Sequence, residues 1–415
     1  MKLPGRAGEG DLPEGEAPAM ARLSVLALLL ALGIGACGGD GAPGGPGEMV
    51  VDTLPGGVIH VRNPEGGSWG SGEGWRLEEE LRIGSADGQG LDAFGDMISS
   101  LALDPLGRVW VADQQSNEVR VFEADGRPVR RVGGTGRGPG EFLIPFRVFP
   151  DPAGRMWVAD VMNARFTVLD TAGAVLETHR RPHPGGGNRP LWGFDGEGRL
   201  LESEIRIVEG GSRESIVRLD ATLAPADTFV LPPMGDPRHL RELRVERSVM
   251  RIQVPYTPMG VVGVGPDHQL WTGWSDTFRL VQRTLEGDTL RVVERAWTPE
   301  PVTAEHRAAA LEEVAWYLEA GGELDPGEIP ATLPAFRDLL VDHEGRPWVV
   351  AATGPRTAPW DRFHLFEADG RYLGEVEVDP PMAPGPVLFG DGVVWATVRD
   401  ELDVVYLVRY RARPR

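Results

Sequence analysis

The sequence predicts an all-β fold, a six-bladed β-propeller built from small antiparallel sheets. Three observations predict it: a turn and strand that recur six times, an alternating strand after each copy, and an N-terminal strand without a repeat of its own. The two clearest copies, Asp104–Asp113 and Asp151–Asp160, start 47 residues apart and differ at only two positions. A near-identical block at such a period is typical of a repeat architecture.

Each copy combines turn residues with a strongly apolar strand. In the first copy Pro105 presets φ and Gly107 suits the positive-φ position of the turn. The strand Val109–Ala112 is apolar at four successive positions, as expected where both faces of a strand are covered. Weaker copies follow at 195–201, 265–271, 342–350 and 390–396. A tryptophan keeps the same place in five copies, at Trp110, Trp157, Trp271, Trp348 and Trp395, and Leu201 replaces it in the third.

An alternating strand and a hairpin turn follow the copies. Phe122–Arg127 recurs letter for letter as Phe366–Arg371, and its Asp-Gly pair favours a tight turn into an outer strand. Each repeat is therefore predicted to be a four-stranded meander. Trp75–Ile83 has no repeat before it, and the last repeat reaches Arg415 without an outer strand. We expect this N-terminal strand to close the last blade and to cover its free edge.

Two long spacings between repeats predict insertions on one face. Leu240–Ile252 is rich in Arg and Glu, and Thr303–Ala320 is predicted to be the one helix, a helical insertion near 303–320. Glu305 favours its start and Gly321 its end, whereas Thr303 with His306 lacks the usual full capping box. The expected buried face of the helix comprises Leu311, Val314, Ala315 and Leu318. The helix is interpreted as a lid over the mouth of the channel, with packing on the rim as the alternative.

The N-terminal region predicts export and lipidation. Residues 1–36 are interpreted as a signal region whose true start is Met20, because Leu23–Leu32 is apolar but too short to span a membrane. Cys37, the only cysteine, ends a segment that resembles a bacterial lipobox; an ordinary signal peptide with an incidental cysteine is the alternative. Residues 37–74 are predicted to be a lipidated flexible tether with a hairpin at Val50–Asn63, and residues 75–415 the propeller. The expected location is the bacterial outer membrane or periplasm, with a lipid anchor in the membrane.

Charge excludes one class of partner. The net charge is −20, and no basic stripe offsets it, so nucleic acid is not an expected partner. The sequence has no nucleophile elbow and no phosphate loop, and its histidines show no metal-ligand spacing.

The repeat resembles the NHL-type six-bladed β-propellers, in particular the propeller lipoproteins of bacteria. The resemblance rests on the Gly-rich junction Gly134–Phe142, on the Asp-x-x-Gly-Arg-x-Trp-Val turn and strand, and on the Phe-Glu-Ala-Asp-Gly-Arg hairpin. It covers residues 75–415 and is strong in the first two full repeats. It implies a binding scaffold in the cell envelope and assigns no chemistry.

Candidate ligand-binding residues are cationic and aromatic. In the predicted repeats, Arg147 and Arg337 occupy matching positions at the starts of two inner strands and are predicted to fork onto a carboxylate; pairing with an acid of the same blade, such as Asp338, is the alternative. An aromatic ligand face is predicted at Trp274, Trp316, Tyr317 and Trp360.

Three acids are weak candidates for a metal site. Asp113, Asp160 and Asp276 approach the same face, where carboxylates could hold Ca²⁺; capping of the strand-end turn is the alternative. The leading hypothesis is a non-catalytic lipoprotein that binds a protein, peptide or small ligand on its loop-rich face, with no cofactor. The alternative is a calcium-dependent lactonase or esterase-like hydrolase that uses channel carboxylates.

Overall fold

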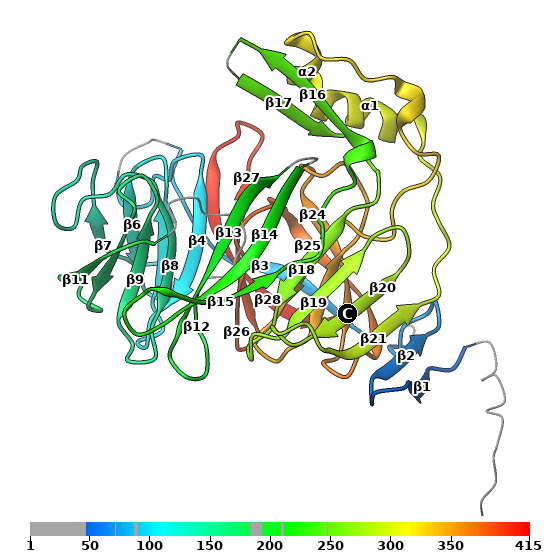
Figure 1. The fold of residues 1–415 in the computed structure, drawn as a ribbon, viewed down its shortest axis with the longest axis horizontal. Helices are drawn as coiled ribbons and strands as arrows, with labels where there is room; N and C mark the ends of the chain where they lie inside the picture. Colours follow the sequence, from blue (N-terminus) through cyan, green and yellow to red (C-terminus); the bar gives the residue numbers. More distant parts are fainter. Residues whose placement is uncertain (1–46, 71, 87–89, 183–192, 209–210, 247) are drawn as a thin grey trace, which may run out of the picture. The chain divides into compact units, whose positions relative to one another are not determined.

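The structure is a computed structural model that describes residues 47–415, except residues 71, 87–89, 183–192, 209–210 and 247 (Figure 1). Strands dominate the described residues, and the fold is all-β. The helices are short: η1 (Pro237–His239), α1 (Ala304–Glu313), α2 (Ala315–Glu319) and η2 (Pro326–Glu328).

Within the described residues, six groups of four antiparallel strands recur along the chain. The first sheet comprises β4 (Ile98–Leu103), β5 (Val109–Asp113), β6 (Glu118–Phe122) and β7 (Pro128–Gly133), and the second β8 (Pro145–Pro150), β9 (Met156–Asp160), β10 (Arg165–Leu169) and β11 (Val175–Arg180). The third comprises β12 (Gly193–Phe194), β13 (Leu200–Val208), β14 (Gly211–Leu219) and β15 (Pro225–Val230), and the fourth β18 (Gly260–Val264), β19 (Leu270–Trp274), β20 (Arg279–Arg283) and β21 (Thr289–Arg295). The fifth comprises β22 (Asp338–Val341), β23 (Pro347–Val350), β24 (Trp360–Phe366) and β25 (Tyr372–Met382), and the sixth β26 (Leu388–Gly390), β27 (Val393–Arg399), β28 (Val405–Pro414) and β3 (Trp75–Ile83).

The N-terminal strand β3 supplies the outer strand of the sixth sheet. It pairs antiparallel with β28, from Ile83 opposite Leu407 to Trp75 opposite Pro414. The predicted pairing of residues 75–83 with the C-terminal strand is therefore present. β3 also pairs in parallel with β25, so the fifth and sixth sheets join as one eight-stranded sheet. The sequence did not predict this second pairing.

The hairpin predicted at Val50–Asn63 is formed by β1 (Val50–Thr53) and β2 (Ile59–Asn63). β2 pairs in parallel with β21 and so extends the outer edge of the fourth sheet. The Asn63 side chain donates to the Gly370 carbonyl oxygen at 2.9 Å and accepts from the Tyr372 amide at 2.8 Å. The hairpin is thus bound to the fifth sheet as well.

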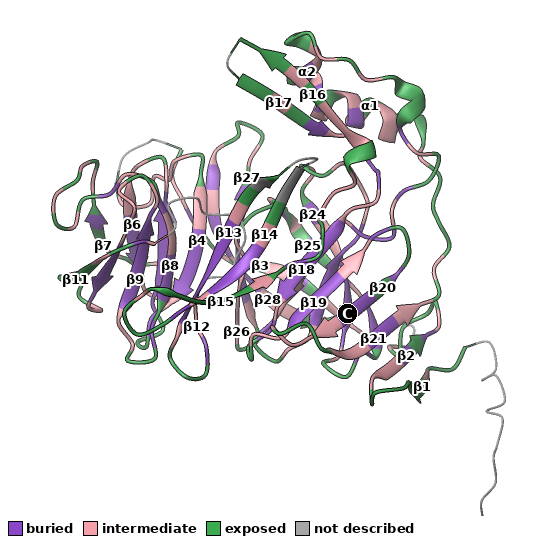
Figure 2. Cartoon of the chain, in the orientation of Figure 1, coloured by how far each residue is buried: buried purple, intermediate pink, exposed green. Residues whose placement is uncertain are grey.

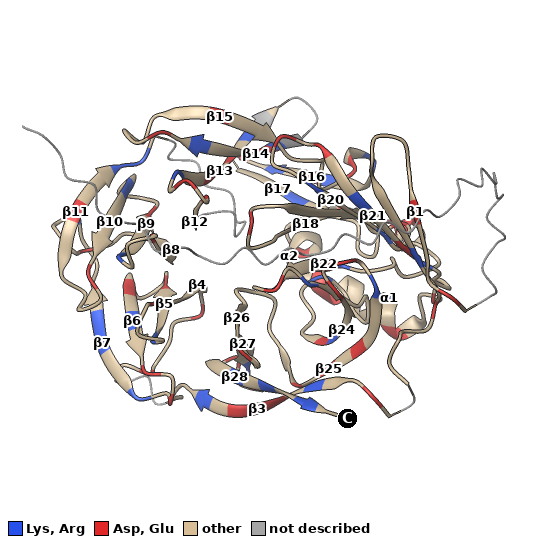
Figure 3. Ribbon diagram, turned by 90° about the horizontal axis from the view of Figure 1, so that it is seen from below, with Lys and Arg blue, Asp and Glu red and all other residues tan. Residues whose placement is uncertain are grey.

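Buried apolar clusters connect neighbouring sheets, and the second strand of a sheet is buried throughout in β5, β9 and β23, as Figure 2 shows for β9. The contacts link the first sheet to the second, the second to the third and fourth, the fourth to the fifth, the fifth to the sixth, and the sixth to the first. Residues of two neighbouring sheets that share one buried cluster are, for example, Trp110 and Met156, Phe166 and Ile216, Trp271 and Val349, Trp348 and Val394, and Trp395 and Val109. In Figure 3 the first strand of each sheet lies nearest the middle of the group, and β7, β11 and β15 lie at the outside.

The recurring turn has a structural explanation in its aspartate. Asp104 accepts hydrogen bonds from Trp110 Nε1 at 3.0 Å and from Arg108 Nε at 2.7 Å. The same two bonds recur at Asp151 and at Asp342. The turn also requires a residue with positive φ, and Gly107 occupies this position with a φ of 77°. The Asp-x-x-Gly-Arg-x-Trp pattern is therefore a hydrogen-bonded unit that fixes the tryptophan of the first, second and fifth sheets.

Candidate functional site

The two predicted insertions pack against each other and form one substructure, here called the cap. Its hairpin consists of β16 (Leu240–Val245) and β17 (Ser248–Gln253), and its helical part of α1 and α2. Ile252 of the hairpin shares a buried cluster with Val314 and Tyr317 of the helical part. Figure 1 shows the four elements together at the top of the view. The sequence predicted both insertions but not that they meet.

Polar contacts fasten the cap internally and to the fifth sheet. The Tyr256 hydroxyl donates to the His306 carbonyl oxygen at 3.2 Å, and Arg241 Nε donates to Glu328 at 3.1 Å. Glu313 of α1 accepts the Thr357 amide at 2.9 Å, in the loop between β23 and β24. The cap is therefore held against a loop of the fifth sheet. The structure leaves the predicted lid over a channel untested.

The start of α1 corrects the prediction about its capping box. Thr303 Oγ1 accepts the His306 amide at 3.2 Å, and His306 Nδ1 accepts the Thr303 amide at 3.3 Å. His306 takes the place that Glu or Gln usually occupies, because an unprotonated ring nitrogen is also an acceptor. The box is complete.

The helix is shorter than predicted, and its buried face differs. It is interrupted at Val314, where α1 gives way to α2. The buried residues are Ala310, Val314 and Tyr317, whereas the predicted residues Leu311, Ala315 and Leu318 are only partly buried. The interruption shifts the helical phase, so the face that an unbroken helix would bury is not the one that packs.

A groove lies at the foot of the cap, between the fourth sheet and the segment that leaves the third. Its volume is about 530 Å³. One wall is the segment Pro232–Pro237, and the other is formed by side chains of β19 and β20, among them Trp274 and Val281. Trp274, one of the predicted ligand-face residues, therefore lies in a concave and largely apolar site.

Charged groups of both signs border the groove. Asp236 stands on the wall, where hydrogen bonds from the Arg238 side chain lower its pKa to about 2. On the opposite wall Arg279 Nε lies 3.3 Å from Glu294 Oε1, and Arg283 donates to the Thr289 hydroxyl at 3.2 Å. The groove thus combines an apolar floor with polar groups at its margins. Arg279, Val281 and Arg283 alternate along β20 and so share one face of the strand. This alternation is the sequence pattern that could have indicated the groove.

Two of the four predicted ligand-face aromatics are buried, so this part of the prediction is wrong. Trp360 is 4% exposed and packs in the cluster shared by the fifth and sixth sheets, and Tyr317 is 2% exposed in the core of the cap. Trp316 is 49% exposed. Trp274 and Trp316 therefore remain as candidates.

Arg337 bonds to the backbone of a neighbouring loop. Its guanidinium donates to the carbonyl oxygens of Pro355 at 2.6 Å, Ala358 at 2.9 Å and Pro359 at 2.6 Å. Burial lowers the pKa of Arg337, and nearby acids partly oppose that shift. Arg337 therefore organises the loop between β23 and β24.

The expectation that Arg147 and Arg337 occupy matching positions is wrong. In the second sheet, Arg147 pairs with Ala159 of the next strand. Val350 is the residue of the fifth sheet that corresponds to Ala159, and it pairs with Asp338 rather than with Arg337. A bulge between Pro145 and Arg147 shifts the register by one residue. The two arginines therefore stand one position apart in their blades.

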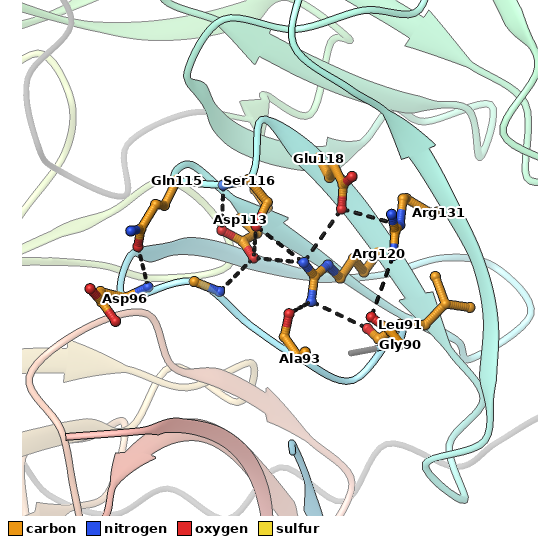
Figure 4. A network of polar contacts seen from close by, with 12 residues as sticks. Gly90, Leu91, Ala93, Asp96, Asp113, Gln115, Ser116, Glu118, Arg120 and Arg131 are labelled. Atoms are coloured by element: carbon orange, nitrogen blue, oxygen red, sulfur yellow. Dashed lines mark hydrogen bonds and ion pairs between the residues drawn. The ribbon is translucent and has the colours of Figure 1, made fainter. Parts of the chain in front are cut away.

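Asp113 belongs to a buried polar network that Figure 4 shows from close by. Its carboxylate accepts the amides of Gly95 at 2.9 Å and Ser116 at 3.1 Å, and lies 3.2 Å from Arg120. Arg120 in turn donates to the Ala93 carbonyl oxygen. The network fixes the loop that leads from β3 into the first sheet.

Asp160 has a similar position in the second sheet. It accepts the Leu143 amide at 3.0 Å and Asn163 Nδ2 at 2.6 Å, and burial raises its pKa. Arg165 donates to the carbonyl oxygens of Gly138 and Glu141, so a guanidinium again fastens the Gly-rich junction. Both aspartates thus hold strand-end turns.

These positions do not fit the predicted calcium site. Asp113 and Asp160 each use their oxygens on the turn after their own strand and on the segment that leads into their sheet. Asp276 is exposed beside the groove, where it accepts the Thr277 hydroxyl at 3.2 Å. Among the described residues, no group of three or more His, Cys, Asp or Glu is placed to hold a metal ion.

Other sequence predictions lie outside the described residues or concern the membrane. Cys37 and the signal region 1–36 fall outside the described residues. In the part of the chain that the structure describes, no helix is both long and apolar enough to span a bilayer. Figure 3 shows acidic and basic residues on most sheets rather than in one stripe.

Comparisons with known proteins agree with the propeller fold. A family model described as a 6-bladed beta-propeller matches residues 97–180, which hold the first and second sheets. None of the curated proteins matches the chain.

Several solved structures are similar to the chain at low identity. A putative exported protein from Bacteroides fragilis is 12% identical, with a TM-score of 0.48, over 85% of this chain and 99% of that one. A catalytically inactive virginiamycin B lyase from Staphylococcus aureus, solved with quinupristin, is 13% identical, with a TM-score of 0.38, over 81% and 88%. A gluconolactonase from Xanthomonas campestris is 13% identical, with a TM-score of 0.35, over 81% and 97%.

Proposed function

We propose that this chain is a cell-envelope lipoprotein whose six-bladed, NHL-type β-propeller binds a small ligand in the groove beside the cap, without catalysis. Residues 75–415 form the propeller in this proposal, and residues 37–74 form a lipidated tether that includes the β1–β2 hairpin. The groove with Trp274 on its wall carries the proposal.

A closed ring of six blades is supported by the buried clusters. Each sheet shares apolar contacts with the next, and Trp395 of the sixth sheet packs in one cluster with Val109 of the first. The pairing of β3 with β28 supplies the fourth strand of the last blade. In such a ring the strands are rigid, and their connecting loops present ligand-binding groups.

The shape and composition of the groove support ligand binding. Its volume of about 530 Å³ lies within the range of roughly 300–1,000 Å³ for small-molecule sites. An indole ring beside prolines and Val281 offers a flat apolar surface, and Arg279 and Asp236 can fix the orientation of polar groups. The ligand that suits this wall is a small aromatic compound with at least one polar substituent.

Binding at the groove can be tested by ligand-observed NMR with the purified full chain and a library of small aromatic fragments. We expect hits whose dissociation constants rise about tenfold in Trp274→Ala, since a stacking and burial contribution of about 1.4 kcal/mol is lost. Trp316→Ala is the matched control, because Trp316 is an exposed tryptophan of the cap. Unchanged melting temperatures of both variants would show that they are folded.

Two outcomes would refute the groove as the binding site. One is that folded Trp274→Ala binds the same fragments as the wild type. The other is that Trp316→Ala loses them instead, which would move the site to the outer surface of the cap.

Anchoring is tested separately through Cys37. In a bacterial host fed an alkyne-bearing fatty acid, we expect the wild-type chain to be labelled and to sediment with membranes. Cys37→Ser is expected to remain unlabelled and to appear in the soluble periplasmic fraction, because no other cysteine is present. Membrane-bound, unlabelled wild-type protein would contradict lipidation.

A further inference from the structure

Arg147 stands on β8, the first strand of the second sheet, opposite the small residue Ala159. The bulge before it displaces the strand locally, which re-aims the side chain relative to the regular pleat. The residue remains partly accessible, yet its Nε is out of contact with solvent. The side chain is therefore partly enclosed by protein and still reachable from solvent.

This guanidinium has no partner in the described part of the chain, where it forms no hydrogen bond and no ion pair. Other arginines with a buried Nε place their terminal nitrogens on carbonyl oxygens, as Arg291 does on Ala368 and Arg409 on Ala124. The chain is not short of acids either, since it has 62 Asp and Glu residues against 42 Lys and Arg.

A guanidinium without a partner in the protein raises the free energy of the folded state unless another interaction offsets this cost. Burial lowers the pKa of Arg147 to about 10, so the side chain is still charged at neutral pH. A buried charge without a counter-ion destabilises a fold, and native proteins normally pair it. Within the described residues, Arg147 forms no hydrogen bond or ion pair that would offset this cost. An external anion would supply the missing acceptors.

We propose that Arg147 is the anchor of an anion-binding site on the inner strand of the second sheet, and that its ligand is a small carboxylate. A carboxylate presents two coplanar oxygens that match the planar fork of a guanidinium. This site is separate from the groove, whose wall is formed by residues of the fourth sheet and of the segment 232–237.

Succinate is the first probe, and inorganic phosphate at equal ionic strength is the second. Thermal unfolding and calorimetric titration of the full chain are expected to show that succinate binds and raises the melting temperature of the wild type. In Arg147→Met, which keeps the length of the side chain but removes its charge, the affinity for succinate is expected to fall at least about tenfold. Arg180→Met is the matched control, because Arg180 is exposed at the end of β11 and is expected to leave the affinity unchanged.

Arg147→Lys provides a second reading if the methionine variant does not fold. Lysine keeps the charge but not the fork, so succinate affinity is again expected to fall, though less than in Arg147→Met. The proposal is overturned if succinate does not bind the wild type, or if folded Arg147 variants bind it as well as the wild type does. Tighter binding of phosphate than of succinate would overturn the carboxylate assignment. Loss of the Trp274 fragments alone would leave this site intact, so the two proposals fail independently.

Discussion

Replacing Leu77 with Ala is expected to lower the free energy of unfolding by about 2–5 kcal/mol. Leu77 lies on β3, is fully buried, and packs in the cluster that the fifth and sixth sheets share. Truncation would open a cavity at the place where the N-terminal strand joins both sheets. Chemical denaturation followed by tryptophan fluorescence would measure the change.

Leu106→Ala is the matched control, since Leu106 is 68% exposed in a turn of the first sheet. The same chemical change there is expected to alter stability by no more than about 0.5 kcal/mol. Equal effects of the two substitutions would contradict the role assigned to β3.

Asp104→Ala is expected to destabilise the fold by about 3–5 kcal/mol, because it leaves a buried cation without its partner. Asp104 is 5% exposed and accepts four hydrogen bonds: from the amides of Leu106 and Arg108, from Arg108 Nε and from Trp110 Nε1. Arg108 also donates to the Thr171 carbonyl oxygen of the second sheet. Loss of the carboxylate would therefore weaken a contact between two sheets as well as a turn.

The same carboxylate predicts the direction of a pH effect. Burial alone would raise the pKa of Asp104, but hydrogen bonds from Arg108 and Trp110 outweigh burial and lower it. A lowered pKa in the folded state stabilises the fold above the unfolded-state pKa of about 4, and this stability is lost as the pH falls further. The melting temperature, measured at a series of pH values from 7 to 3, should therefore decrease less with falling pH for Asp104→Ala than for the wild type.

Asp125→Ala serves as the control for the stability measurement at neutral pH, because Asp125 is an exposed turn residue that bonds to Arg127. If it destabilised the chain as much as Asp104→Ala does, the effect could not be attributed to the buried Arg108 and Trp110.

The sequence allowed the repeats to be predicted because their turn is chemically specific. Aspartate, glycine, arginine and tryptophan at fixed places are all needed for one local network, as the bonds of Asp151 show. The pairing of Trp75–Ile83 with the last repeat also followed from the repeat, since one strand was left over before the first repeat and one outer strand was missing from the last. Local chemistry and the number of strands per repeat were sufficient for these features.

The candidate site was less predictable because it depends on contacts between distant segments. Nothing in the sequence indicates that Ile252 meets Tyr317, and the bulge that separates Arg147 from the register of Arg337 has no glycine to mark it. Aromatic residues contribute both to cores and to binding surfaces, so the sequence did not show that Trp360 is buried. Trp274 was predicted as a ligand-face residue, and the structure places it on the wall of the groove, at the end of a recognisable repeat strand.

The connection between the two ends of the chain has a consequence for biogenesis. β3 is synthesised before the other strands of the six sheets, whereas β28, against which it forms an antiparallel ladder, is synthesised after the strands of the first five sheets. Its parallel neighbour β25 also comes late. Until β28 has been synthesised, the sixth sheet has no complete set of strands, and unpaired strand edges of this kind favour aggregation of the nascent chain.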